Sequence, residues 1–241
     1  MQLFCLAHAG ASAMPYARWR PSLPRWLEVC PLELPGRGAR AGEPLQRDFE
    51  RLLDDLQAAW RAECQGPCLL WGHSLGGLLA FELAHRLHAE RKRAPLALFV
   101  SACRAPSRRA LAPRLAEGSD GALIAALDEL VGLPRAVLGD PAVCAEYLPV
   151  LRADFALAES YRYRRRGPLP CELHVLGARQ DSLGEEELRP WRREARADIH
   201  LHWLEGDHFY LRPQQAEVLQ LIELHALRLW RAEALPMPLG A

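Results

Sequence analysis

Short apolar runs of strand length alternate with amphipathic stretches along most of this chain. The apolar runs cover 2–7, 26–34, 68–71, 95–101, 171–176 and 199–204. Between and after them, apolar residues recur at helical spacing over 45–64, 75–87, 186–196 and 213–231. The order strand, helix, strand predicts parallel pairing through right-handed crossovers. The pattern therefore predicts an α/β fold, with a mostly parallel central sheet and helices on both faces.

The segment from about 104 to 166 breaks this alternation, because it is helical in pattern and has no clear strand. Two apolar faces can be traced in it, one with Leu123, Leu127, Leu130 and Val131, the other with Leu148, Leu151, Phe155 and Leu157. A crossover between two strands needs fewer residues than this. We expect one domain over 1–241, in which about 104–166 forms a helical lid over the functional site. The alternative is an ordinary pair of packing helices.

A serine bracketed by glycines follows the third apolar run. Gly72, Ser74 and Gly76 satisfy the pattern GxSxG, a sharp strand-to-helix turn that lifts a serine hydroxyl clear of a sheet. The strained backbone of such a turn requires residues with almost no side chain on either side of the serine. A strand pattern before the motif and a helix pattern after it favour a nucleophilic Ser74. The alternative is a tight glycine turn with an incidental serine.

A nucleophilic serine needs a base within reach and an acid that orients the base, which follow in the order Ser, Asp or Glu, His in this architecture. His208 lies in a glycine-bearing loop just after the last predicted strand, and we assign it as the base. Asp181 lies beyond the end of the preceding strand, 27 positions before His208, and is the predicted acid. Asp207 is its rival. Six other histidines are interpreted as structural or exposed: His73, His85, His88, His174, His200 and His202.

An oxyanion hole needs two backbone amides near the nucleophile. One is the amide after the serine, here Leu75, and the other comes from a loop after an early strand. The small residues of 8–12 form such a loop, in which Ala9 is the best placed. Without the serine motif, the same loop would be an ordinary strand-to-helix turn.

Charge and cysteine content narrow the classes of function. Thirty basic and thirty acidic residues give formal neutrality, which argues against nucleic-acid or membrane-surface binding driven by bulk charge. The seven cysteines are an odd number, lie mostly in apolar runs and lack zinc-site spacing, so we expect buried thiols in a reducing compartment and no metal site. No signal peptide or membrane-spanning run is recognised. We therefore expect a cytoplasmic protein.

Arginines stand out in two places. Arg37 and Arg40, at the turn formed by 35–38, are expected at the surface. Arg162, Arg164, Arg165 and Arg166 alternate with two tyrosines and would suit a phosphate or an acidic partner, although such a run is more often a solvated face. The proline-rich tail, 235–238, is expected to be loose.

Taken together, these residues resemble the type II thioesterases of nonribosomal peptide and polyketide assembly lines, members of the α/β-hydrolase superfamily. The resemblance covers nearly the whole chain in six ordered segments: His8–Gly10, Leu34–Gly38, Trp71–Gly77, Ser101–Pro106, Leu148–Tyr161 and Gly206–Phe209. The sequence departs from the family at Ala11 and Asp207, where glycine is common. Neither position belongs to the predicted catalytic group.

The resemblance implies an α/β-hydrolase fold and a stand-alone editing enzyme of an antibiotic or siderophore pathway. Such an enzyme removes acyl or aminoacyl groups from the phosphopantetheine arm of acyl or peptidyl carrier proteins supplied in trans. It implies no metal or cofactor, because the arm belongs to the partner, and we expect a monomer. Two alternatives stay open: a general carboxylesterase or fatty-acyl carrier thioesterase, and a noncatalytic protein that docks a carrier.

Overall fold

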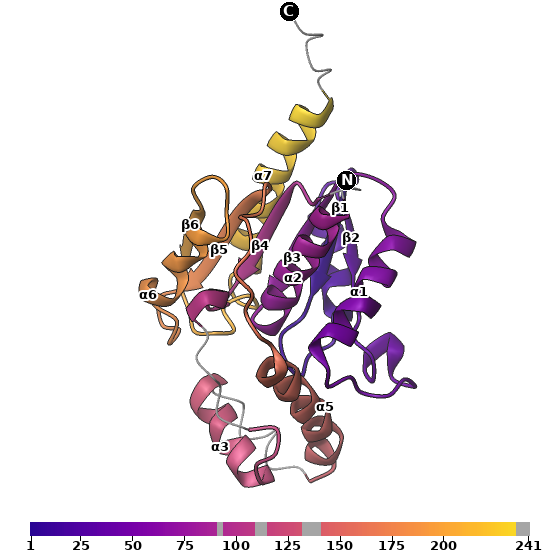
Figure 1. Ribbon diagram of the computed structural model, residues 1–241, viewed down its shortest axis with the longest axis vertical. Helices are drawn as coiled ribbons and strands as arrows, with labels where there is room; N and C mark the ends of the chain where they lie inside the picture. The colour runs from indigo at the N-terminus through magenta and orange to yellow at the C-terminus, as the bar shows by residue number, and fades with distance from the viewer. Residues whose placement is uncertain (91–93, 109–114, 132–140, 235–241) are drawn as a thin grey trace, which may run out of the picture.

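Six strands form one sheet in the computed structural model, which describes residues 1–90, 94–108, 115–131 and 141–234. The strands are β1 (Gln2–Leu6), β2 (Glu28–Pro31), β3 (Cys68–His73), β4 (Ala97–Ser101), β5 (Glu172–Ala178) and β6 (His200–Leu204). Their order is β2-β1-β3-β4-β5-β6, and each neighbouring pair is parallel (Figure 1). The predicted α/β class and the six predicted strands are confirmed.

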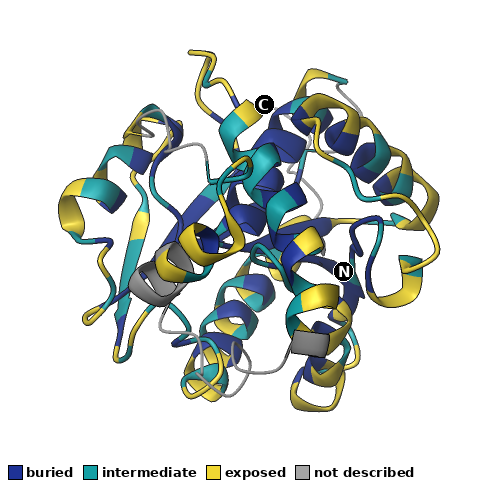
Figure 2. Cartoon of the chain, turned by 90° about the horizontal axis from the view of Figure 1, so that it is seen from below, coloured by how far each residue is buried: buried dark blue, intermediate teal, exposed yellow. Residues whose placement is uncertain are grey.

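Helices cover both faces of the sheet and give it two apolar cores. On one face, α1 (Phe49–Glu63) and α2 (Leu75–Ala89) bury leucines against β1 and β3. On the other, α7 (Gln215–Ala234) and the 3-10 helix η1 (Met14–Ser22) pack against the opposite side chains of the same strands. Figure 2 shows buried segments at the centre and exposed residues on the outer turns of the helices around them. Alternate residues of each strand therefore serve different cores.

Helix ends differ from the predictions where a cap or a proline intervenes. Helix α1 begins at Phe49 rather than 45, because the Asp48 side chain accepts the backbone N–H of Arg51 and caps the first turn. The helix expected over 186–196 is instead two short pieces, α6 (Glu185–Leu188) and the 3-10 helix η4 (Arg189–Arg193). Pro190 has no N–H to donate, so an α-helix does not continue through it.

The segment between β4 and β5 lies beyond one end of the sheet (Figure 1). It contains the 3-10 helix η3 (Pro106–Arg108) and the α-helices α3 (Asp120–Val131) and α5 (Pro141–Ser160). Its described part contains no strand. Leu123, Leu148 and Leu151 form a small separate core, whereas Leu157, predicted on the same face, packs into the α1–α2 core. The side chains of Leu127, Leu130 and Val131 lie outside the described residues, as does the tail 235–238. Helix α5 thus joins this segment to the main body.

The arginines at 162, 164, 165 and 166 are exposed, as the solvated-face interpretation predicts. Arg166 nevertheless has a fixed role, since its Nη2 lies 2.5 Å from Glu82 Oε2 and its guanidinium lies over the Phe81 ring. The segment after α5 is therefore held against α2. None of the described helices combines the length and apolar character required to cross a membrane.

Candidate active site

Ser74 occupies the turn between β3 and α2, as the GxSxG pattern predicts. Its φ and ψ of 54° and −114° are strained for a residue other than glycine. The Ser74 N–H donates to the Ser101 carbonyl at the end of β4, at 2.8 Å, which fixes the turn against the neighbouring strand. The serine is half-buried, while the residues on both sides of it are buried. The backbone of this turn therefore leaves the Ser74 side chain partly exposed, while its neighbours His73 and Leu75 are buried.

Two glycines make this turn possible. A Cβ at Gly72 would lie 2.1 Å from the Gly76 carbonyl oxygen, and a Cβ at Gly76 would lie 2.3 Å from the Leu6 carbonyl oxygen. Both distances are too short for any side chain. The second contact also shows that the first turn of α2 lies directly against the end of β1, which leads into the loop containing Ala9.

Asp181 and His208 are brought together by the ends of β5 and β6. The His208 Nδ1 lies 2.9 Å from the Asp181 Oδ2, in hydrogen-bond contact. The Asp181 side chain is 1% exposed and also accepts the Leu183 N–H. Because β3, β5 and β6 are parallel, Ser74, Asp181 and His208 all follow the carboxyl ends of their strands at the same edge of the sheet. Asp207 is exposed and accepts the Phe209 N–H instead.

The loop after β1 has the backbone needed for a second oxyanion donor. The Ala11 N–H donates to the His8 carbonyl and closes a turn, in which Gly10 has a φ of 80°. The Gly10 N–H donates to Asp154. These bonds leave the Ala9 N–H without an acceptor in the described part of the chain, as an oxyanion donor requires. The Leu75 N–H is at the first position of α2, where it has no partner within the helix.

Arg37 is buried, so the prediction that it lies at the surface is wrong. Its two terminal nitrogens each lie 2.6 Å from an oxygen of Asp154, which is fully buried on α5. The turn 35–38 therefore directs the Arg37 side chain inward, because both oxygens of the buried Asp154 carboxylate accept hydrogen bonds from its guanidinium. Arg40 is half-buried and pairs with Glu43 and Asp55. The Arg37–Asp154 pair connects three segments, since Asp154 also holds Gly10.

A buried chain of polar side chains, His73, Ser101 and Tyr210, begins beside Ser74, and it was not predicted from the sequence. The His73 Nδ1 lies 2.7 Å from the Ser101 Oγ, which lies 2.5 Å from the Tyr210 hydroxyl. The His73 ring contacts those of His8 and His208, with centroids 5.6 and 5.5 Å apart. Nothing in the spacing of His73, Ser101 and Tyr210 signals this chain, because pairing of β3 with β4 brings His73 beside Ser101 and the turn after β6 adds Tyr210.

The thioesterase-domain family matches residues 1–225. The chain belongs to this family. It is 36% identical over 233 residues to the thioesterase PikA5 of Streptomyces venezuelae, with 94% of this chain and 81% of that protein covered. The thioesterase RedJ, from the prodiginine biosynthetic pathway in Streptomyces coelicolor, matches with a TM-score of 0.86 at 31% identity, covering 93% and 89%. ClbQ, from the colibactin NRPS/PKS pathway, matches with a TM-score of 0.90 at 28% identity, covering 96% and 98%.

These matches confirm the family and the α/β-hydrolase fold of its solved members. The similarity extends along the chain rather than stopping at the serine motif. The thioesterase therefore shares with type II thioesterases of assembly-line pathways the segment between β4 and β5 as well as the sheet.

Burial should keep two histidines of the thioesterase site neutral. Desolvation, and then the nearby His208 charge, lower the pKa of His8 to about 4. Desolvation, and then the charges of His8 and His208, hold the pKa of His73 well below its ordinary value. We expect neither ring to titrate between pH 8 and pH 5.5, as measured by NMR of the histidine C2 protons. A midpoint above pH 6 for either ring would contradict the burial seen here.

The same pKa shifts determine how the free energy of unfolding changes with pH. Below about pH 6.5 the unfolded chain protonates both rings while the folded thioesterase does not, so acid favours unfolding. We expect the free energy of unfolding to fall as the pH drops from about 6.5 through about 4. Each ring contributes a slope of at most about 1.4 kcal/mol per pH unit. Urea unfolding at pH 7.5 and pH 5 measures this loss.

Arg37→Leu should destabilise the thioesterase by about 3–5 kcal/mol, because it leaves a buried Asp154 carboxylate without its partner. We also expect a lower kcat, since Asp154 anchors the Gly10 amide beside Ala9. Arg40→Leu is the matched control: Glu43 is exposed and Asp55 is half-buried, so water screens both partners and the loss should be much smaller. Urea unfolding and steady-state kinetics of the two variants test this, and equal losses would contradict it.

Proposed function

We propose that this thioesterase hydrolyses acyl or aminoacyl thioesters held on the phosphopantetheine arm of carrier proteins, which bind in trans. The carrying observation is the Asp181–His208 hydrogen bond at the sheet edge where the strained Ser74 turn also lies. This is the arrangement needed for acyl transfer to a serine. Relatives from NRPS/PKS pathways support carrier-bound substrates and an editing role.

The proposed reaction begins at Ser74. The hydrogen bond to Asp181 places a proton on the His208 Nδ1, which leaves the Nε2 free to accept the Ser74 hydroxyl proton. The Ser74 Oγ then attacks the thioester carbonyl and forms a tetrahedral intermediate. The backbone N–H groups of Leu75 and Ala9 stabilise its oxyanion.

Collapse of the intermediate breaks the carbon–sulfur bond, and His208 returns the proton to the departing thiol of the carrier arm. Water, deprotonated by His208, then attacks the acyl-enzyme ester and releases the carboxylic acid. The buried Asp181 carboxylate stabilises the imidazolium in both steps. Every step uses groups of this chain and its substrate, and we propose that no metal or diffusible cofactor takes part.

The segment 104–166 is proposed as the lid of this site. Helix α5 contacts the loop after β1, residues 8–12, which contains the proposed oxyanion donor Ala9. Asp154 accepts the Gly10 N–H, and Tyr147 and Leu151 lie against Gly10. Its small separate core lets α3 and part of α5 shift without opening the main core. A moving α5 would change the oxyanion loop and the access to Ser74 together.

The proposed function is tested by comparing one acyl group on three leaving groups: a holo-carrier protein, a short pantetheine-like thiol and a simple ester. We expect the highest kcat/KM with the carrier thioester. A tenfold or greater preference for the ester would contradict the proposal and favour a general carboxylesterase. Greatest activity on medium-chain fatty-acyl carriers would favour the activity named for a rat relative, a medium-chain fatty acid synthase thioesterase that is 28% identical.

A further inference from the structure

Four histidines gather on the sheet face that α7 covers, beside the last two strands of the sheet order, β5 and β6. His174 on β5 pairs in register with His200 on β6, and His202 follows two positions later on the same face. His225 reaches them from α7. The ring centroid of His174 lies 4.1, 4.6 and 5.5 Å from those of His225, His200 and His202. Three separate elements thus bring imidazoles to one point.

Three of these rings have the spacing of metal ligands. The His174 Nδ1 and the His202 Nε2 are 3.3 Å apart. Two nitrogens at about 2.0–2.1 Å from a tetrahedral zinc ion are separated by about 3.4 Å. One nitrogen each of His174, His202 and His225 lies within 4.8 Å of the other two.

The cluster also carries buried nitrogens that lack hydrogen-bond partners. His174 is completely buried, and His225 is half-buried with a buried Nδ1; within the described residues, neither the His174 Nε2 nor the His225 Nδ1 has a hydrogen-bond partner. A buried polar atom without a partner loses its hydration and gains nothing in return. The His225 Nδ1 therefore suits a ligand that accepts its lone pair, whereas the His174 Nε2 faces a carboxylate.

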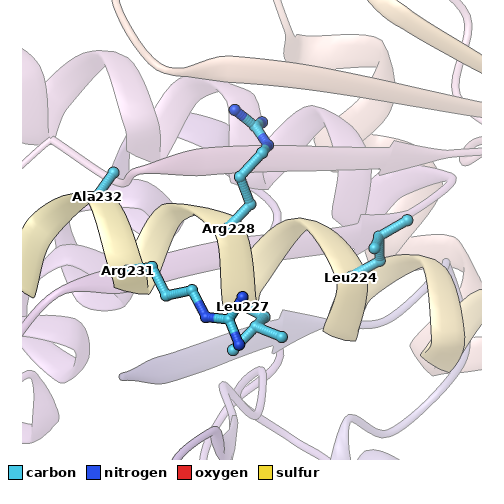
Figure 3. Close-up of a pocket in the computed structure, with 5 residues that line it drawn as sticks. All are labelled: Leu224, Leu227, Arg228, Arg231 and Ala232. Carbon is cyan, nitrogen blue, oxygen red and sulfur yellow. The ribbon is translucent and has the colours of Figure 1, made fainter.

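A carboxylate lies behind the buried histidine. The Glu172 Oε2 is 3.5 Å from the His174 Nε2, and Arg228 on α7 holds Glu172 in an ion pair. Metal-binding histidines usually direct their second nitrogen toward a carboxylate in this way. The Arg228 charge opposes a bound cation, and Glu172 offsets it. Figure 3 shows Arg228 on α7 among the residues that line a surface pocket, with its side chain directed to a different side of the helix from those of Leu227 and Arg231.

We propose that His174, His202 and His225 bind one divalent transition-metal ion of the zinc class. Imidazole nitrogens are preferred by zinc, copper and nickel, and three of them leave a fourth position for water.

The site is separate from the catalytic residues. His174 lies near the start of β5, whereas Asp181 follows its end, and the four residues to Ala178 alone span about 13 Å of strand. A metal here would connect α7 to the edge of the sheet and stabilise the folded chain by mass action. The proposal does not depend on the proposed function. The expectation of no metal site rested on cysteine spacing, which this histidine cluster does not involve.

Zinc titration of the full chain, after removal of metals by chelation, tests the proposal. We expect one Zn²⁺ per chain by calorimetry and elemental analysis, and a rise in melting temperature. His225→Ala should weaken binding at least tenfold. His88→Ala, which removes an exposed histidine of α2, and His208→Ala, which removes the histidine of the catalytic site, should bind as the unmodified chain does.

Absence of zinc uptake, or equal uptake by the unmodified chain and His225→Ala, would overturn the proposal. X-ray absorption of the zinc-loaded, unmodified chain gives a test that does not depend on folding of a variant. We expect nitrogen or oxygen neighbours at about 2.0–2.1 Å and no sulfur. Sulfur neighbours at about 2.3 Å would assign the metal to cysteines and overturn the proposal.

Discussion

Ser74→Ala should lower kcat for carrier-thioester hydrolysis by roughly a thousandfold to a millionfold. The loss is this large because the variant has no oxygen nucleophile, while the Asp181–His208 pair cannot attack a carbonyl by itself. The fold should be preserved, since alanine removes one oxygen from a half-buried side chain. Single-turnover release of the acyl group from a loaded carrier protein measures the effect.

Ser160→Ala is the matched control for this variant. Ser160 is exposed at the end of α5, and its hydroxyl donates only to the Leu157 carbonyl, so activity should be unchanged. If Ser74→Ala kept a tenth or more of the activity, Ser74 would not be the nucleophile. If the unmodified chain had no hydrolytic activity and Ser74→Ala still bound the loaded carrier, the noncatalytic docking alternative would be favoured.

Asp181→Asn should lower kcat by about ten-thousandfold, the size of the loss when the acid of a serine triad is neutralised. An asparagine amide at this position presents an N–H to the His208 Nδ1 and favours the wrong tautomer, so the Nε2 no longer accepts the serine proton. Asp207→Asn is an isosteric control one residue before His208. Because Asp207 is exposed and its side chain accepts the Phe209 N–H rather than contacting His208, most activity should remain.

The two asparagine variants are compared by kcat on the same carrier thioester. The opposite ranking, with Asp207→Asn inactive and Asp181→Asn active, would transfer the acid role to Asp207. Equal activity of both variants with that of the unmodified chain would mean that His208 needs no carboxylate. The buried position of Asp181 argues against either result.

The sheet and the positions of the candidate catalytic residues could be predicted because they depend on local patterns. Buried parallel strands are short apolar runs, and a serine between glycines marks a backbone turn that few other residues allow. Chain order then placed Asp181 and His208 after successive strands. Parallel pairing brings these strand ends to one edge, so sequence order was enough to assemble the site.

The features that sequence missed depend on contacts between distant segments. Arg37 was expected at the surface because arginine usually is; only the fold reveals a buried carboxylate on α5, 117 positions away. The His73–Ser101–Tyr210 chain and the histidine cluster arise in the same way, from three separate segments of the chain each. The extent of α6 was overestimated because helical periodicity was followed through Pro190.

The most direct test of the account is mass spectrometry of the acyl-enzyme. The full chain is mixed with an acyl-loaded carrier protein, quenched in acid within the first turnover, and analysed intact and after digestion. We predict a mass increase equal to one acyl group, located on the peptide that contains Ser74, and an equal amount of carrier with a free thiol. Release of the acid with no acyl group on Ser74, or an acyl group on a cysteine instead, would contradict it.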